Sequence, residues 1–291
     1  MSARLKLMIS MIIFGTLGLF VRNISLNSGE LALYRAILAA LFIGIYLFLS
    51  KQKICWKEIG KELPILFVSG IAMGMNWIFL FEAYKYTTVS IATLSYYFAP
   101  VIVTVVCPLL FHEKLTWKNI ICFLMSTAGL VLIIGVGDNM NETAGKGIIY
   151  GLGAATLYAT VIILNKCVKK VAGLPRTLLQ FFAAILILMP YVAYTGGIHL
   201  QQLDFSGWIC LLIVGLVHTG ITYCLYFTAL KDLKGQETAI LSYIDPLVAV
   251  VVSVLLLNEK ITLWQLAGGI LILGFTLLNE IDIPIRQEKE G

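Results

Sequence analysis

Ten long apolar stretches, separated by short polar connections, constrain this 291-residue chain more than any other feature. A helix needs about 20 apolar residues to cross ~30 Å of hydrocarbon. Stretches close to that length lie at roughly residues 6–22, 31–50, 64–84, 87–111, 115–136, 147–168, 175–195, 206–229, 236–257 and 262–280. Because helices satisfy their own backbone hydrogen bonds in lipid, the sequence predicts an all-α membrane protein with ten transmembrane helices.

The composition excludes several other classes of protein. Hydrophobic residues make up 59% of the chain and charged residues 13%, which is too apolar for an ordinary soluble domain. The net charge of +5 is spread along the chain, so we expect no nucleic-acid partner. The six cysteines occur singly, which indicates no metal site, and we expect no cofactor. The absence of a GxxxxGK[ST] motif argues against ATP-driven pumping by this chain alone.

The basic residues predict how the helices are oriented. With the N-terminus in the cytoplasm, sixteen of the 21 Lys and Arg residues fall in inner connections or tails, and Arg35 lies within a span. The remaining four would lie outside: Arg22, Lys85, Lys146 and Lys260. This asymmetry follows the positive-inside rule. We therefore expect a multi-pass plasma (inner) membrane protein with both termini cytoplasmic.

The sequence also repeats itself. "FEAYKYTTVSIATLSYYFAPVIVTVVCPLLFHEKLT" (81–116) aligns without gaps with "FTALKDLKGQETAILSYIDPLVAVVVSVLLLNEKIT" (227–262), with 12 of 36 positions identical. Each half holds five spans, an odd number, so equivalent helices must run in opposite directions. Inverted repeats are common in secondary transporters, although channels and some membrane enzymes also contain repeats. We expect one repeat at 1–138, a second at 146–283, and a cytoplasmic tail at 284–291.

The segments "APVIVTVVCPLLFHEKLT" and "DPLVAVVVSVLLLNEKIT", together with Arg35 in "LALYR", resemble the ten-helix EamA-type members of the drug/metabolite transporter superfamily. The resemblance covers nearly the whole chain as two five-helix units. It implies export or uptake of small metabolites such as amino acids, amines or sugars, generally without ATP, through a cavity between the halves.

One carboxylate, Asp245, is predicted near the middle of the ninth span, directly before Pro246. A charge there costs about 2.5 to 3.5 kcal/mol on insertion scales, so such a residue normally faces a cavity or a partner. Proline removes a backbone donor and favours a helix break. Pro100 occupies the equivalent position in the fourth span, but Ala99 stands where the acid would be. Asp245 is therefore a candidate substrate or proton site, or a carboxylate that is held for helix packing.

Arg35 and Glu82 form a second candidate group, predicted in the outer third of the membrane. Glu82 can pair with Lys85 one turn further on, or with Arg35 across helices, as a gate or a structural ion pair. Gln180 stands near the position equivalent to Arg35, so this group too is not duplicated.

The remaining candidates combine polar and aromatic groups near mid-depth, where rings can stack on a ligand or enclose a cation. An imidazole there can also relay protons. Ordinary packing accounts for each of them equally well. They are His218, Asn76, Trp77, Tyr97, Tyr158 and Tyr243.

These observations favour a secondary active transporter, in the exporting direction, of a small amino acid or amine, working by alternating access. Its partners would be the small-molecule substrate, the lipid bilayer and H⁺ or Na⁺ as coupling ion, and the chain would be a monomer or a homodimer. The alternatives are a channel and a carrier of nucleotide sugars or lipid-linked sugars. An intramembrane protease is disfavoured, because Asp138 of "GVGD" is predicted at a span end, far from Asp245 in depth.

Overall fold

A computed structural model describes residues 2–50, 56–112, 116–135, 142–171, 173–233 and 235–280, without the side chains of 56–58, 134–135, 235–236, 239 and 280. In these ranges the regular structure is helical and contains no strand. Seven helical units are long and apolar enough to cross a membrane, and three shorter apolar helices complete the set: Trp117–Ile133, Ile240–Leu255 and Leu263–Asn279. The prediction of an all-α membrane protein with ten spans is confirmed.

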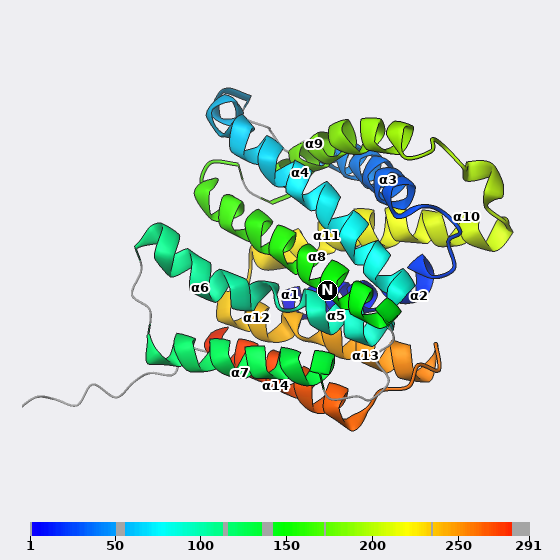
Figure 1. The fold of residues 1–291 in the computed structure, drawn as a ribbon. Coiled ribbons are helices and arrows are strands. Elements are labelled where there is room, and N and C mark those ends of the chain that lie inside the picture. The colour runs from blue at the N-terminus through cyan, green and yellow to red at the C-terminus, as the bar shows by residue number, and fades with distance from the viewer. Residues whose placement is uncertain are drawn as a thin grey trace, which may run out of the picture.

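Several spans consist of more than one helical element (Figure 1). The first half contains α1 (Ala3–Gly15), α2 (Leu17–Val21), α3 (Ser28–Leu49), α4 (Trp56–Tyr86), α5 (Val89–Tyr96), α6 (Ala99–Phe111) and α7 (Trp117–Gly135). The second half contains α8 (Glu142–Cys167), α9 (Gly173–Tyr194), the 3₁₀ turn η1 (Leu200–Gln202), α10 (Phe205–Leu212), the π-helical segment η2 (Ile213–Ile221), α11 (Thr222–Leu230), α12 (Gly235–Ser242), α13 (Ile244–Leu255) and α14 (Leu263–Glu280). The first, fourth and ninth spans are interrupted, at Thr16, at Tyr97 and Phe98, and at Tyr243.

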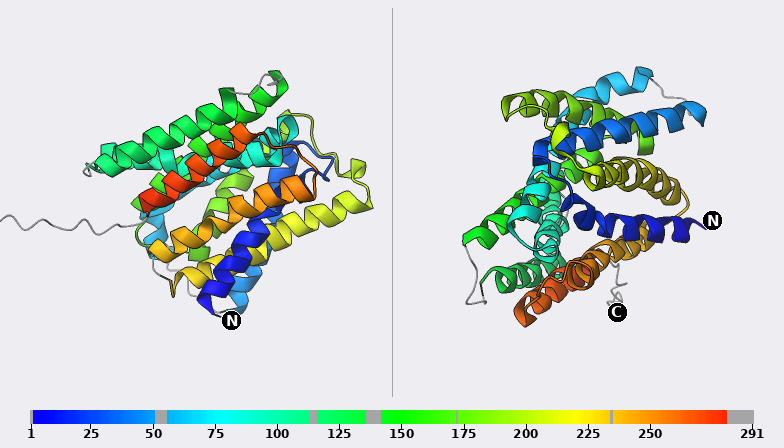
Figure 2. Two further views of the ribbon diagram at one scale, coloured as in Figure 1. Left: turned by 90° about the horizontal axis from the view of Figure 1, so that it is seen from below. Right: turned by 90° about the vertical axis from the view of Figure 1, so that its right-hand side faces the viewer.

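Helix packing follows the symmetry of the two halves. Helix α4 of the first half packs on α8 and α9 of the second half. The symmetry-related contacts join α11 and η2 of the second half to α1 and α3 of the first. Three further contacts join each helix to its own counterpart: α3 to α9, α5 to α13, and α7 to α14. Figures 1 and 2 show α7 and α14 side by side. This is the arrangement expected of two inverted five-helix repeats.

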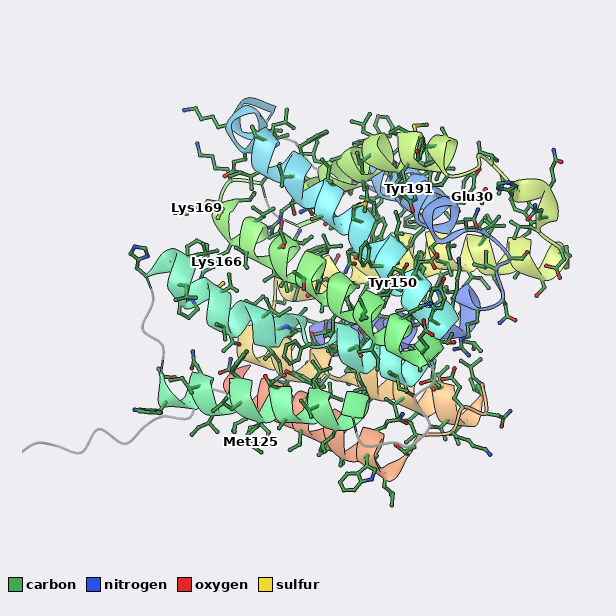
Figure 3. All side chains as sticks on the ribbon, in the orientation of Figure 1. Glu30, Met125, Tyr150, Lys166, Lys169 and Tyr191 are labelled. Atoms are coloured by element: carbon green, nitrogen blue, oxygen red, sulfur yellow. The ribbon has the colours of Figure 1, made fainter. Side chains whose placement is uncertain are left out.

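The two ends of the bundle carry different groups. Figure 3 shows Lys166 and Lys169 at one end, which the charge count predicts to be inside, and Glu30 at the opposite end. These are called below the predicted inner end and the predicted outer end. Between them, large apolar side chains point outward, including Ile45 (60% exposed) and Leu186 (60%). A continuous apolar surface of this kind fits contact with lipid.

The interruptions in the fourth and ninth spans lie at equivalent places. Helix α5 ends at Tyr96 and α6 begins at Ala99, while α12 ends at Ser242 and α13 begins at Ile244. Pro100 and Pro246 stand in the first turns of α6 and α13. A missing N–H costs nothing there, because the first turn of a helix leaves its N–H groups without helical partners. Each of these spans is therefore two helices joined near the membrane centre.

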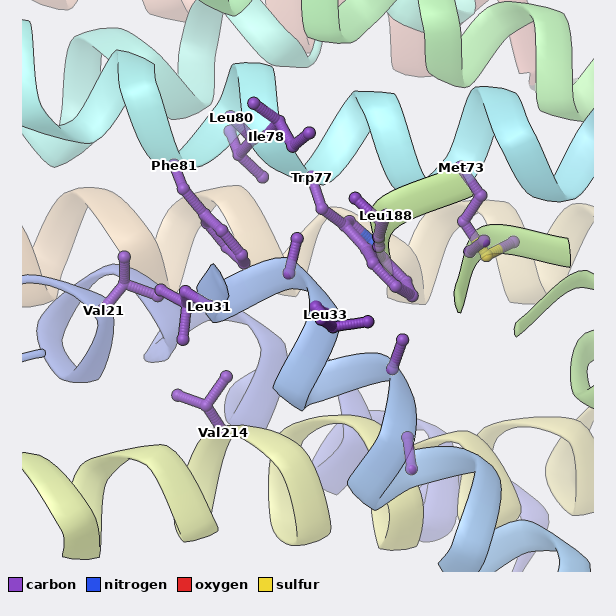
Figure 4. Close-up of a cluster of buried hydrophobic side chains, with 14 of the residues drawn as sticks. Val21, Leu31, Leu33, Met73, Trp77, Ile78, Leu80, Phe81, Leu188 and Val214 are labelled. Atoms are coloured by element: carbon purple, nitrogen blue, oxygen red, sulfur yellow. The ribbon is translucent and has the colours of Figure 1, made fainter. Parts of the chain in front are cut away.

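The main apolar core lies where α3, α4, α9 and η2 meet. Figure 4 shows Trp77 and Phe81 pointing from α4 toward α3, with Leu188 of α9 beside Trp77. Phe81 is fully buried and Trp77 is 4% exposed. This core fixes α3, and with it Arg35, against both halves.

Small residues allow the closest helix contacts. A methyl group added to Gly70 would meet the backbone of Gln180, and one added to Gly151 would meet Ser95. Gly15, the last residue of α1, lies against the backbone carbonyl of Asp245: an added Cβ would sit 2.5 Å from that oxygen and 2.6 Å from Cβ of Val248. The interruption before α13 therefore depends on a glycine in the other half.

We expect Gly15→Ala to destabilise the protein by about 1 to 3 kcal/mol, the usual cost of overpacking. The neighbouring group is backbone and cannot rotate away. Gly44→Ala is the matched control, since nothing lies within 4 Å of the added methyl group. Thermal unfolding of both variants in detergent tests this. Equal melting temperatures for the two variants would contradict it.

Candidate functional site

Asp245 lies at the start of α13, where the ninth span is interrupted. Its side chain is partly buried, and its Oδ2 accepts a hydrogen bond of 2.5 Å from the hydroxyl of Tyr97. Tyr97 caps the C-terminal end of α5, at the interruption of the fourth span. The two interruptions therefore meet through this hydrogen bond, which joins one half of the molecule to the other.

Four more tyrosines lie within electrostatic range of the Asp245 carboxylate: Tyr84, Tyr96, Tyr158 and Tyr223. With Tyr97 they form what is called here the tyrosine cluster. Tyr96 packs on Tyr97 at 6.0 Å and on Tyr158 at 5.3 Å between ring centroids. Tyr158 is 39% exposed. A carboxylate among aromatic rings is a suitable environment for an organic cation.

Arg35 is close to three of the same tyrosines. Its guanidinium group is within electrostatic range of Tyr84, Tyr96 and Tyr223. The group stacks over the rings of Trp77, at 4.7 Å, and Phe81, at 5.7 Å. A charged donor and a charged acceptor thus share Tyr84, Tyr96 and Tyr223 as electrostatic neighbours.

The hydrogen bonding of Arg35 is incomplete within the described residues. Arg35 is 4% exposed, and its Nε donates to Oγ1 of Thr219 over 2.7 Å. In the described part of the chain, no carboxylate oxygen lies within 4.0 Å of its nitrogens. A guanidinium has five N–H donors and is costly to bury without acceptors. The geometry suits an anionic ligand that approaches the remaining donors.

The π-helical segment η2 positions Thr219. Oγ1 of Thr219 donates to the carbonyl of Val214, and Oγ1 of Thr222 donates to that of Val217, each five residues back. π-Helical turns occur frequently at functional sites. Here the segment directs the oxygen of Thr219 toward Arg35.

His218, also in η2, is a buried residue with partners on both sides of its ring. Nε2 lies 2.9 Å from Oγ1 of Thr16, Nδ1 lies 3.3 Å from the carbonyl of Ile213, and Phe20 packs edge-on at 5.0 Å. Thr16 is the residue at which the first span is interrupted. The contacts join η2 to α2 and to the interruption of the first span.

Asn76 and Trp77 lie in helix interfaces. Nδ2 of Asn76 donates to the carbonyl of Ala154 over 2.6 Å, which joins α4 to α8. The ring of Trp77 lies under Arg35 and packs edge-on against Phe181 at 5.3 Å. Tyr243 caps the N-terminal end of α13 and is partly buried. Of the predicted residues, Tyr97, Tyr158 and Asp245 come together, while Trp77 lies under Arg35 and His218 is within electrostatic range of it. Asn76 instead bonds the backbone of α8.

Glu82 pairs with Lys85, three residues along α4, at 3.1 Å. The cross-helix alternative, a pair with Arg35, is not what the structure shows. Arg35 instead stacks on Trp77 and Phe81. Nε2 of Gln180 donates hydrogen bonds to Oγ of Ser69, at 2.6 Å, and to Oδ1 of Asn165, at 2.8 Å.

The sequence did not reveal an ion pair between the halves at the predicted outer end. Nη1 of Arg22 lies 2.5 Å from Oε1 of Glu259, and Nη2 donates to the carbonyl of Thr87 over 2.6 Å. Oε2 of Glu259 also accepts from the backbone N–H of Val89, at 2.9 Å. The Glu-Lys pair that recurs in the two aligned segments, as Glu113-Lys114 and Glu259-Lys260, was the available signal. Its first copy, Glu113-Lys114, lies outside the described residues, as does Asp138.

The comparisons with known proteins agree with this architecture. The family model described as "EamA-like transporter family" matches twice, at residues 1–135 and 145–280. The chain is 31% identical to the "Uncharacterized transporter YxxF" of Bacillus subtilis (strain 168) over 273 residues, which is 93% of this chain and 87% of that protein. It is 25% identical to the "Probable amino-acid metabolite efflux pump" of Salmonella typhimurium (strain LT2) over 186 residues, 61% of this chain and 62% of that one.

One solved crystal structure shares the fold with a TM-score of 0.64 at 17% sequence identity, covering 95% of this chain and 97% of that one. The two matches of the family model together span most of the sequence, one in each five-helix half. The chain therefore belongs to the EamA-like transporter family, within the drug/metabolite transporter superfamily.

Proposed function

We propose that this transporter is a secondary carrier that exports a small zwitterionic or cationic metabolite, an amino acid or an amine, by alternating access. The observation that carries the proposal is the Asp245 carboxylate at a paired helix interruption, among five tyrosines. In this proposal the carboxylate holds the ammonium group of the substrate, or a proton that exchanges with it.

Arg35 extends the proposal from amines to amino acids. Its guanidinium group and the Asp245 carboxylate both lie within electrostatic range of Tyr223, so in this proposal a zwitterion bound beside these tyrosines meets a cation and an anion of the protein. Charge-assisted hydrogen bonds are about twice as strong as neutral ones. The carboxylate of an amino acid would fill the donors of Arg35 that the described residues leave unfilled.

Alternating access is supported by the inverted repeat and by the position of the interruptions. In inverted-repeat transporters the binding site lies at the repeat interface, near interrupted helices, and one bundle rocks against the other. The Tyr97–Asp245 hydrogen bond lies at such an interface. The similarity to a protein named as an amino-acid metabolite efflux pump supports the substrate class and the direction of transport. The charge count supports an inner-membrane location with cytoplasmic termini.

We expect Asp245→Asn to lower counterflow of the substrate at least about tenfold, a loss of 1.4 kcal/mol in binding of the cation. The substrate would come from a thermal-shift screen of amino acids and amines, and counterflow would be measured in proteoliposomes across a range of pH. Asp204→Asn is the matched control, because that carboxylate caps α10 through Gly207. Unchanged rate and unchanged pH dependence in Asp245→Asn would overturn the role given to this residue.

We expect Thr219→Val to raise the half-saturation concentration for an amino acid about tenfold, since a hydrogen bond to a charged group contributes about 1.5 to 3 kcal/mol. Thr219 acts through Arg35 as a positioning residue, so the matching amine without a carboxylate should be unaffected. Thr195→Val removes an exposed hydroxyl that bonds the carbonyl of Tyr191 and serves as control. An equal loss for the amine would show that the effect is structural.

A further inference from the structure

A cavity of about 370 Å³ lies at the predicted outer end, among α2, α3, α4 and the connection between α2 and α3. Ligand pockets for small molecules have volumes of about 300 to 1,000 Å³. Its walls are hydrocarbon side chains except for four residues with polar groups, Arg22, Ser28, Tyr84 and Lys85. Neither Asp245 nor Arg35 lines it, so this space is separate from the candidate site.

The charged groups that line the cavity are both positive. Arg22 and Lys85 are paired with Glu259 and Glu82, but those two acids are not part of the lining. Oγ of Ser28 is buried, 2% exposed as a residue, and has no hydrogen-bond partner among the described residues. Buried hydroxyls are normally hydrogen-bonded. The lining therefore provides two cations and a hydroxyl without a partner, which together suit a small anionic group.

Two aromatic side chains that line the cavity also lie near the candidate site. Phe81 lines the cavity, and its ring lies 5.7 Å from the guanidinium carbon of Arg35. Tyr84 lines the cavity too and is within electrostatic range of both Arg35 and Asp245. Figure 4 shows Phe81 beside Trp77 on α4. Phe81 and Tyr84 therefore belong to the lining of the cavity and also lie near the charged groups of the candidate site.

We propose that the outer cavity is a second binding site, for a solute that carries a carboxylate, which the solute occupies after leaving Arg35. This inference rests on the proposed function for the identity of the solute. In the cavity the carboxylate accepts hydrogen bonds from Ser28 and from Lys85 or Arg22. At Arg22 it takes the place of Glu259.

The exchange at Arg22 has a consequence for the two halves. Arg22 comes from the first half and Glu259 from the second, and the same carboxylate holds the N-terminal end of α5 through Val89. A solute carboxylate on Arg22 would remove one of these links. Binding in the cavity would thus loosen the outer contact between the halves.

The repeat shows that the polar lining is not an obligatory part of the architecture. In the gap-free alignment Phe81 and Lys85 match Phe227 and Lys231, but Tyr84 matches Leu230 and Glu82 matches Thr228. The inverted copy therefore keeps the ring and one cation but lacks the hydroxyl and the acid. The difference makes the two ends of the transporter chemically unequal.

The test is thiol labelling of Ser28→Cys in nanodiscs of phosphatidylcholine, which carry no net lipid charge. The labelling rate of the introduced cysteine is measured with the anionic sulfonatoethyl methanethiosulfonate and with the cationic trimethylammonioethyl reagent. Each rate is divided by the rate of the same reagent with free 2-mercaptoethanol, which removes the difference in intrinsic reactivity. The parent chain measures the native cysteines, of which Cys107, Cys122, Cys210 and Cys224 are buried. Leu26→Cys, at another lining position, replaces Ser28→Cys if that variant does not fold.

We expect the anionic reagent to react about tenfold faster, at the low end of the effect of a charged cleft on association. Propionate should slow this reaction, and propylammonium should not. Adding Lys85→Gln should reduce the preference. Lys146→Gln, which removes a predicted outer lysine that pairs with Glu142 and does not line the cavity, should leave it unchanged.

Equal rates for the two reagents, no protection by propionate, or an equal effect of Lys146→Gln would overturn the second site. The labelling requires no transport, so it is independent of the counterflow assay. Charge-selective labelling that persists in Asp245→Asn supports the cavity whatever that substitution does to transport. Normal transport with unselective labelling would instead refute the cavity alone.

Discussion

Water is absent from the hydrocarbon core, and this decides how each polar group in this chain is held. A backbone or side-chain group that lacks a partner there costs several kcal/mol. Asn76 is satisfied by a carbonyl of α8, Gln180 by Ser69 and Asn165, and Thr219 by a carbonyl of its own helix. These groups bond to other groups of the protein, and the bonds of Asn76 and Gln180 join neighbouring helices. Arg35 and Asp245 differ, because each makes one described hydrogen bond although a guanidinium can donate five and a carboxylate can accept several.

The inverted repeat supplies the frame, and departures from it supply the chemistry. The interruptions of the fourth and ninth spans, each followed by a proline, are common to both halves. Asp245 stands opposite Ala99, and Arg35 corresponds approximately to Gln180, so each charge occurs once. An alternating-access carrier needs two packings of similar energy, which the symmetric frame provides. It also needs a binding site with charges in an asymmetric arrangement, and charges that occur in only one half provide this.

The sequence predicted the spans, the repeat and the residue types of the candidate site, because hydropathy and rare charges are local signals. It did not predict that Tyr97 would bond Asp245, since that depends on how two helices are rotated relative to each other. For Glu82 it left two partners open. The structure selects Lys85, on the same helix, while the rings of Trp77 and Phe81 occupy the face of Arg35. The pair of Arg22 and Glu259 lies 237 positions apart in the chain, beyond the reach of any local pattern.

The π-helical segment sets the angle at which α11 faces the rest of the protein. A turn with bonds to the fifth residue back contains one residue more than the α-helix it interrupts, and one residue of α-helix corresponds to about 100° of rotation. Deleting a single residue between Ile213 and Ile221 would leave an unbroken, fully hydrogen-bonded helix. It would also swing Tyr223 and Tyr226 away from Phe14 and Phe181, which they now contact. Such a chain would still span the membrane, but its aromatic side chains would face in another direction. The length of this segment is therefore itself part of the site.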